Sequence, residues 1–137
     1  MAQSSPTNSE LVDAHKLVIR VNERRKQGKL IQREELDQAA RQMVLQLPKF
    51  SYEPAELYQR GMTPAERLKK IGLATNVRPI EKCAHKTGML SSKDSLIVQV
   101  VGTWLKDPNF AAVVLDRRYL WCGAAYRDNC YVLLVAG

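Results

Sequence analysis

The stretch from Pro79 to Leu115, PIEKCAHKTGMLSSKDSLIVQVVGTWLKDPNFAAVVL, decides how this chain folds. It begins with a short strand-like segment, and apolar residues then recur at helical spacing from the N-cap Ser92 to Trp104. Asp107 and Pro108 restart the chain as a shorter helix, because proline fits the first turn of a helix. The stretch therefore predicts a strand followed by two helices, around which the rest of the chain is organised.

The residues before this stretch predict three helices. The first has Ser9 as its N-cap and ends at Gly28, and the second spans residues 32–47. The third begins at a capping box at Thr63 and ends at Gly72. Prolines bracket two aromatic residues in 47–54, which predicts a loop whose rings either line a groove or, as we expect, pack on the core. The first helix is expected to face the core with Leu11, Ala14, Val18 and Val21.

Two apolar runs close the chain. Tyr119–Tyr126 and Cys130–Val135 predict an antiparallel hairpin, and continuous apolarity in the second run predicts a central strand covered on both faces. Helices on each side of the sheet would supply that cover, so the expected fold class is α+β: a small α/β/α layered sandwich with a central antiparallel sheet flanked by helices. We expect a polar N-terminal tail over residues 1–8 and a single domain over residues 9–137.

Size and composition are those of a globular protein. The chain has 137 residues, of which 45% are hydrophobic and 26% charged, and no apolar run is long enough to span a membrane. The polar N-terminus does not have the pattern of a secretory signal, which predicts either an intracellular protein or one whose signal was removed before Met1. The three cysteines leave at least one unpaired, which argues against a disulfide-stapled scaffold.

The net charge of +7 favours an acidic partner, such as an acidic protein surface or an anionic lipid. A nucleic-acid partner is not expected, because the basic residues are spread along the chain without interleaved aromatic residues. The basic residues concerned are Arg20, Arg24, Arg25, Lys26, Arg33, Arg60, Lys69, Lys70, Arg117 and Arg118.

Few residues carry a pattern typical of catalysis. The glycines are scattered, and the sequence holds neither an HExxH nor a CxxC pair, which argues against nucleotide and zinc chemistry. Glu81, Cys83 and His85 alternate along the strand-like segment and would share one side of it, as a carboxylate, a thiol and a base. A hydrolase built on these three residues is an alternative, but neighbours on a strand rarely hold the geometry that a nucleophile and its base need, so we expect a structural role.

With these elements in place, the chain resembles the CAP superfamily, the cysteine-rich secretory, antigen 5 and pathogenesis-related 1 proteins. Glu81 resembles the glutamate of the family's Glu-Asn motif, with Lys82 in place of the asparagine. Trp104, Asp107 and Pro108 resemble its Trp-x-x-Ser-Pro stretch. Further matching positions are Asn22, Arg25, Leu36, Ala39, Ala40, Met43, Arg67, Gly72, Leu115, Gly123 and Tyr131.

The resemblance implies a central cleft that in the family holds two histidines and two acidic residues around a divalent metal. Here Glu81 takes one acidic position and Asp107 lies near the other, but Phe110 stands where the later histidine belongs. The earlier histidine would fall in residues 50–52, which hold none, and His85 is the one nearby substitute. Phenyl has no lone pair for a metal, so we expect no metal and no cofactor.

The resulting prediction is a non-enzymatic CAP-like binding or scaffolding domain with a degenerate metal cleft. One version is a structural subunit of a larger assembly with an acidic surface, such as a filament or a microtubule. The alternatives are a metal-dependent enzyme or hydrolase using Glu81, Cys83 and His85, and a secreted protein that binds a lipid or a sterol.

Overall fold

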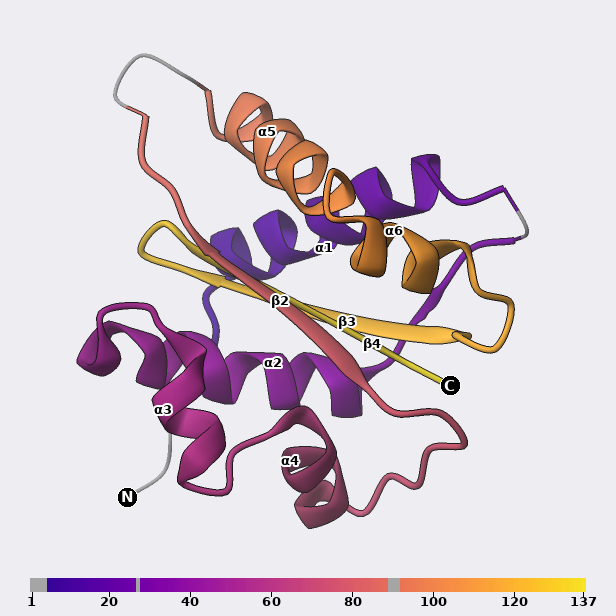
Figure 1. The fold of residues 1–137 in the computed structure, drawn as a ribbon. Helices are drawn as coiled ribbons and strands as arrows, with labels where there is room; N and C mark the ends of the chain where they lie inside the picture. The colour runs from indigo at the N-terminus through magenta and orange to yellow at the C-terminus, as the bar shows by residue number, and fades with distance from the viewer. Residues whose placement is uncertain (1–4, 27, 89–91) are drawn as a thin grey trace.

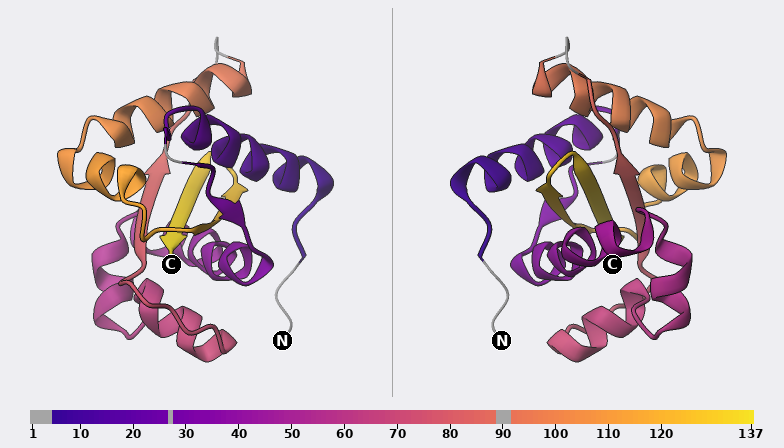
Figure 2. Two further views of the ribbon diagram at one scale, coloured as in Figure 1. Left: turned by 90° about the vertical axis from the view of Figure 1, so that its right-hand side faces the viewer. Right: turned by 90° about the vertical axis from the view of Figure 1, so that its left-hand side faces the viewer.

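The computed structural model describes residues 5–26, 28–88 and 92–137 (Figure 1). Within that part of the chain one four-stranded sheet lies between two layers of helices (Figures 1 and 2). One layer contains α1 (Asn8–Glu23), α5 (Lys93–Leu105) and α6 (Pro108–Leu115). The other contains α2 (Glu34–Gln46), the 3-10 helix η1 (Leu47–Phe50), α3 (Pro54–Gln59) and α4 (Pro64–Ile71). The predicted α+β sandwich is confirmed.

The sheet has the strand order β1-β3-β4-β2. These strands are β1 (Ile31–Gln32), β3 (Trp121–Arg127), β4 (Cys130–Ala136) and β2 (Ile80–His85). The three long strands are antiparallel, as predicted, whereas β1 pairs in parallel with the start of β3 and makes the sheet mixed. Two residues are too short to show a period of two, so the sequence pattern contained no sign of β1.

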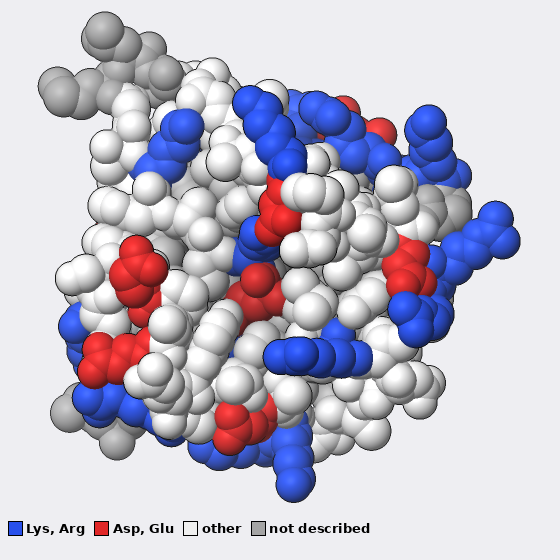
Figure 3. All heavy atoms as spheres, viewed as in Figure 1, with Lys and Arg blue, Asp and Glu red and all other residues white. Residues whose placement is uncertain are grey.

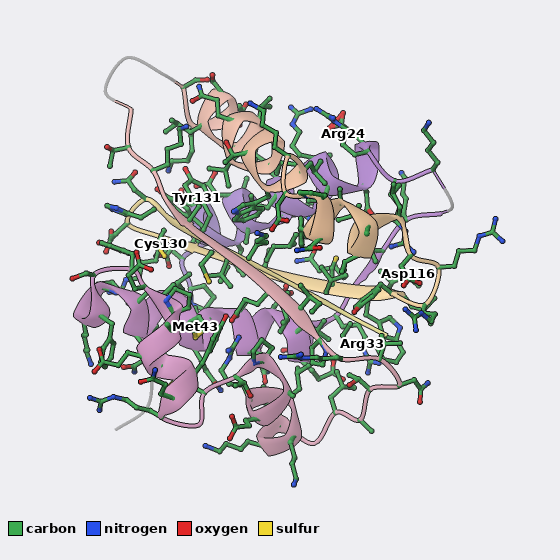
Figure 4. All side chains as sticks on the ribbon, viewed as in Figure 1. Arg24, Arg33, Met43, Asp116, Cys130 and Tyr131 are labelled. Carbon is green, nitrogen blue, oxygen red and sulfur yellow. The ribbon has the colours of Figure 1, made fainter. Side chains whose placement is uncertain are left out.

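The final hairpin turns at Asp128 and Asn129, which have φ values of 48° and 65°. Two consecutive residues of positive φ are typical of a type I′ turn, whose twist matches that of the strands it joins. All seven residues of β4 are buried, which confirms the central strand covered on both faces. Figure 4 shows Tyr131 of this strand on the side of α1 and α5 and Met43 on the opposite side, within α2.

The first helix begins earlier than predicted. Thr7, not Ser9, is the N-cap: its hydroxyl accepts from the main-chain N–H of Glu10, and the Glu10 side chain accepts from the N–H of Thr7. This reciprocal pair satisfies two donors that the first turn leaves free. Of the polar tail predicted over residues 1–8, residues 1–4 lie outside the described residues.

Leu11 does not face the core as predicted. It is 49% exposed, whereas Ala14, Leu17, Val18 and Val21 are buried against the sheet and α5. Leu11 lies one turn before this stripe, where α1 borders an open pocket of about 350 Å³ beside β3. The helix also ends at Glu23, before Gly28.

The loop predicted over residues 47–54 is more ordered than expected. It contains η1 and leads into α3, and Ser51 and Tyr52 between them have φ values of 54° and 62°. Bulky residues rarely adopt positive φ, so this reversal is a strained feature that the surrounding packing holds in place. The rings of Phe50 and Tyr52 pack against the core layer of α2, as predicted.

The second helix, predicted over residues 32–47, is α2 (Glu34–Gln46), because Gln32 pairs in β1. The predicted starts of α4 and α5 are confirmed. Thr63 caps α4 by accepting from the N–H of Glu66, and Pro64 opens the helix. In place of a full capping box, the Glu66 carboxylate accepts from the Thr63 hydroxyl. Ser92 caps α5 in the same way through the N–H of Ser95. None of the helices in the described ranges has the length and apolarity that a membrane crossing needs.

Candidate functional site

The candidate site lies on both faces of β2. Because side chains alternate along a strand, Glu81, Cys83 and His85 face the layer of α2, α3 and α4, as the sequence predicts. The residues between them face the other layer, where Lys82 meets the start of α6. In the view of Figure 3, acidic and basic side chains meet in a hollow near the middle of the face.

Glu81 is the acidic residue on which the predicted cleft depends, and its side chain is fully buried against Arg67. The Arg67 guanidinium donates to both carboxylate oxygens of Glu81, and the hydroxyl of Tyr58 donates to Oε2 at 2.6 Å. Arg67 also donates to the main-chain oxygens of Ala39 and Met62, at 3.0 and 2.8 Å. One buried cation therefore ties β2 to α2 and to the start of α4.

The electrostatics of this cluster are those of a closed ion pair. Burial raises the pKa of the Glu81 carboxyl, and the adjacent Arg67 guanidinium and Tyr58 hydroxyl oppose that rise by stabilising the carboxylate. Burial, with the nearby Glu81 charge, also raises the pKa of the Tyr58 hydroxyl, which keeps it a donor at neutral pH. Both oxygens of Glu81 thus accept hydrogen bonds from protein groups.

Cys83 and His85 have different surroundings. The Cys83 thiol packs among the apolar side chains of the α2 layer, and its burial raises the pKa of the thiol well above its ordinary value. His85 lies on the exposed end of the strand, where its ring stacks on Tyr52 with centroids 3.7 Å apart and planes within 5°. The positive-φ turn at Tyr52 thus places the Tyr52 ring against the His85 ring.

On the opposite face of β2, Lys82 joins the two remaining predicted site residues. Its Nζ donates to Asp107 at 2.6 Å and lies 5.7 Å from the centre of the Phe110 ring. Asp107 also caps α6 through the N–H of Asn109, and the Lys82 hydrogen bond, followed by that of Asn109, lowers the pKa of the Asp107 carboxyl. Phe110 is 2% exposed and packs edge-on against Trp104.

The four predicted site residues thus fall into two groups. Glu81 and His85 lie on the α3 side of β2, while Asp107 and Phe110 lie on the α6 side. A pocket of about 320 Å³ opens beside Glu81, between β2, α3 and the start of α4. Across residues 5–26, 28–88 and 92–137, no three His, Cys, Asp or Glu side chains come close enough together to hold a metal ion.

Two residues central to this cluster, Tyr58 and Arg67, were not expected to contact Glu81. From the sequence, Arg67 is identified only as a position that matches the CAP superfamily. Tyr58 lies in α3, a helix that the sequence pattern did not predict. A buried arginine gives no periodic signal, because a charged residue type does not extend the apolar stripe that Leu68 begins on α4, and Glu66 and Lys69 nearby are exposed. The capped start of α4 was the one available clue to its position.

Comparison with known proteins identifies the architecture. No family model and no curated protein sequence matches the chain. Among solved structures, an outer surface protein from Borrelia burgdorferi superposes with a TM-score of 0.73 at 22% identity, over 99% of this chain and 98% of that one.

Two further structures carry the name of the domain. An extracellular protein containing an SCP domain from Bacillus anthracis has a TM-score of 0.69 at 14% identity, over 98% of this chain and 45% of its own. A cysteine-rich secretory protein from Staphylococcus aureus has a TM-score of 0.69 at 15% identity, over 98% of this chain and 41% of its own. The chain spans less than half of these two proteins. Its structure is that of a divergent CAP-like fold.

Proposed function

We propose that this chain is a non-enzymatic CAP-like domain that works by binding, and that its Glu81 has become a structural residue. The observation that carries this proposal is the hydrogen bonding of Glu81: both carboxylate oxygens accept from Arg67, and one also accepts from Tyr58. A metal at this carboxylate would have to displace a buried guanidinium and would face its positive charge.

The other face of β2 supports the same proposal. The phenyl ring of Phe110 lies close to Lys82, beside Asp107. The ammonium group of Lys82 forms an ion pair with the Asp107 carboxylate. A divalent cation prefers several carboxylate, imidazole or thiolate donors around one point. Here each of the two carboxylates is paired with a cation of this chain.

Zinc titration tests the proposal. Calorimetry of the purified chain with ZnCl₂ is expected to show no stoichiometric binding, and Glu81→Gln is expected to leave that result unchanged. Glu66→Gln, which changes an exposed carboxylate on α4, is the matched control. One equivalent of zinc that binds the wild type and the Glu66 variant but not the Glu81 variant would contradict the proposal.

The thiol alternative has its own test. Because burial raises the pKa of Cys83 well above its ordinary value, and that of Cys122 and Cys130 to about 12, all three thiols are expected to resist iodoacetamide in the folded chain at about pH 8. Mass spectrometry in urea should then find all three alkylated. Rapid and selective alkylation of Cys83 without denaturant would instead support a catalytic thiolate.

A further inference from the structure

β2 is an edge strand, and half of its main chain faces away from the sheet. The N–H of Lys86 donates to Asn129 at 2.9 Å, which continues the antiparallel register of β2 with β4 as a hydrogen-bonded pair. Such pairs recur at every second residue. The N–H and C=O groups of Lys82 and Ala84 therefore point at β4, whereas those of Glu81, Cys83 and His85 point outward.

The burial of Glu81 agrees with this geometry. Its side chain is 0% exposed, yet the residue as a whole keeps intermediate exposure. The exposed part of Glu81 is therefore its main chain. Within the part of the chain that the structure describes, the outward groups of Glu81, Cys83 and His85 have no hydrogen-bond partner from the protein.

At the opposite edge of the sheet, formed by β3 and β1, outward main-chain groups have hydrogen-bond partners within the chain. There the chain itself pairs the first part of the edge: Ile31 and Arg33 donate to the main-chain oxygens of Leu120 and Cys122, around β1. The N–H of Ala124 then donates to the carboxylate of Asp37 at 2.9 Å. A short strand and an aspartate thus cover the edge of β3 as far as Ala124, whereas β2 presents three successive sets of free groups.

The charged side chains at the two ends of β2 favour an added strand that is acidic. The two charges on the strand are already paired, Glu81 with Arg67 and Lys82 with Asp107. Arg78 and Lys86, one at each end, have no carboxylate partner among the described residues. They lie eight positions apart, or roughly 26 Å in an extended chain at about 3.3 Å per residue.

The pocket beside Glu81 adjoins the same edge. It is lined by Tyr58, Thr63, Pro64 and residues 78–81, so it opens at the first half of β2, next to the outward main chain of Glu81. Side chains of an added strand would point alternately to the two faces of the sheet. One of them would enter this pocket as an apolar anchor.

We propose that the free edge of β2 binds an extended acidic segment of a partner protein as an additional strand of the sheet. Main-chain hydrogen bonds to Glu81, Cys83 and His85 supply the affinity, and Arg78, Lys86 and the pocket supply the selectivity. This inference rests on the proposed binding function and names its partner class. A second copy of the chain is a poorer occupant, because each copy carries a net charge of +7.

The test uses random peptides of about nine residues, the length that spans β2 and its two flanking cations. A display library panned on the purified full chain is expected to enrich acidic peptides with alternating apolar residues. A synthetic peptide of the enriched sequence is then titrated into isotope-labelled chain and followed by NMR. Its binding should slow hydrogen exchange at the amides of Glu81, Cys83 and His85.

A proline variant separates strand addition from other binding modes. His85→Pro removes an outward N–H while leaving the hydrogen bonds to β4 intact, and proline is tolerated on an edge strand. The enriched peptide should bind this variant about tenfold more weakly, a loss of about 1.4 kcal/mol. His85→Ala loses the stacking on Tyr52 but keeps the N–H, so it is the matched control and should bind like the wild type.

Charge reversal tests the acidic partner. The double variant Arg78→Glu and Lys86→Glu should weaken binding of the acidic peptide on the order of tenfold at low salt. Enrichment of basic or neutral peptides, protection at amides away from β2, or equal binding by His85→Pro and His85→Ala would each overturn the inference. So would concentration-dependent dimerisation that protects the same amides without peptide.

The experiments distinguish a failure of the non-enzymatic proposal from a failure of the strand-addition proposal. Stoichiometric zinc lost in Glu81→Gln would contradict the non-enzymatic proposal whatever peptides bind. A chain that takes up no zinc and enriches no acidic peptide would contradict the strand addition alone.

Discussion

At the scale of single residues, the buried ion pair of Arg67 and Glu81 holds β2 against the helices α2 and α4. A buried ion pair adds little net stability compared with apolar residues of the same volume, but removing one partner leaves an uncompensated charge in the core. Arg67 is also hydrogen-bonded to two main-chain oxygens, so its loss would leave several acceptors without a donor. Removing either residue of the pair is therefore expected to destabilise the fold, because the other residue stays buried without its partner.

Arg67→Met is expected to lower the free energy of unfolding by about 3–5 kcal/mol, because Glu81 stays buried without its cation. Urea denaturation followed by circular dichroism measures the change. The double variant Arg67→Met with Glu81→Met should recover part of the loss, since no unpaired charge remains. Arg60→Met, which removes an exposed partner of Glu56, is the control and should change stability by less than about 1 kcal/mol. If Arg67→Met lowers the free energy of unfolding as little as this control does, the structural role of the ion pair is contradicted.

At the scale of elements, cap residues and close contacts set where helices begin and how near they approach the sheet. A serine before an apolar stripe suggested the start of the first helix, yet a threonine two residues earlier forms the full capping box. Both residues are good N-caps by type, so the sequence left the choice to tertiary packing.

Thr7→Ala is expected to destabilise the fold by about 1 kcal/mol, because the N–H of Glu10 loses its acceptor. Ser9→Ala lies inside the helix and should cost less than about 0.5 kcal/mol. Thermal or urea unfolding of the two variants side by side measures the difference. A larger loss of stability in Ser9→Ala than in Thr7→Ala would indicate that Ser9 is the N-cap.

The approach of α2 to β3 depends on a glycine. A Cβ atom at Gly123 would overlap the main chain of Leu36 and Asp37, whereas one at Gly102 in α5 would meet open space. Gly123→Ala is therefore expected to cost about 3 kcal/mol or more, since backbone has to move. Gly102→Ala should be neutral or stabilise by up to about 1 kcal/mol. Melting temperatures of the two variants test this, and equal melting temperatures would contradict the close contact.

At the scale of the whole molecule, periodicity predicted the layers and alternation predicted which residues of β2 share a face. The long hairpin, the buried β4 and the helices α4, α5 and α6 all carry strong local signals of caps and apolar runs. The resemblance to CAP proteins followed from the same residues and agrees with the fold.

The arrangement of the candidate site could not be predicted in the same way. The resemblance implies that Glu81 and Asp107 share one cleft. In the structure the Glu81 side chain points to one face of β2, and Asp107 contacts Lys82 on the other face. Arg67 and Tyr58 reach Glu81 only through tertiary packing of two short helices. The free edge of β2 likewise depends on strand order, which a sequence pattern does not contain.

Native-state hydrogen exchange, resolved by NMR for each amide along β2, measures whether the edge of this strand is open. The amides of Lys82 and Ala84 point at β4 and are expected to exchange slowly, whereas those of Glu81, Cys83 and His85 are expected to exchange much faster. On the other edge, the amide of Ala124 should be protected by Asp37. Uniform protection along all of β2 would show that its edge is already covered and would contradict the proposed strand addition.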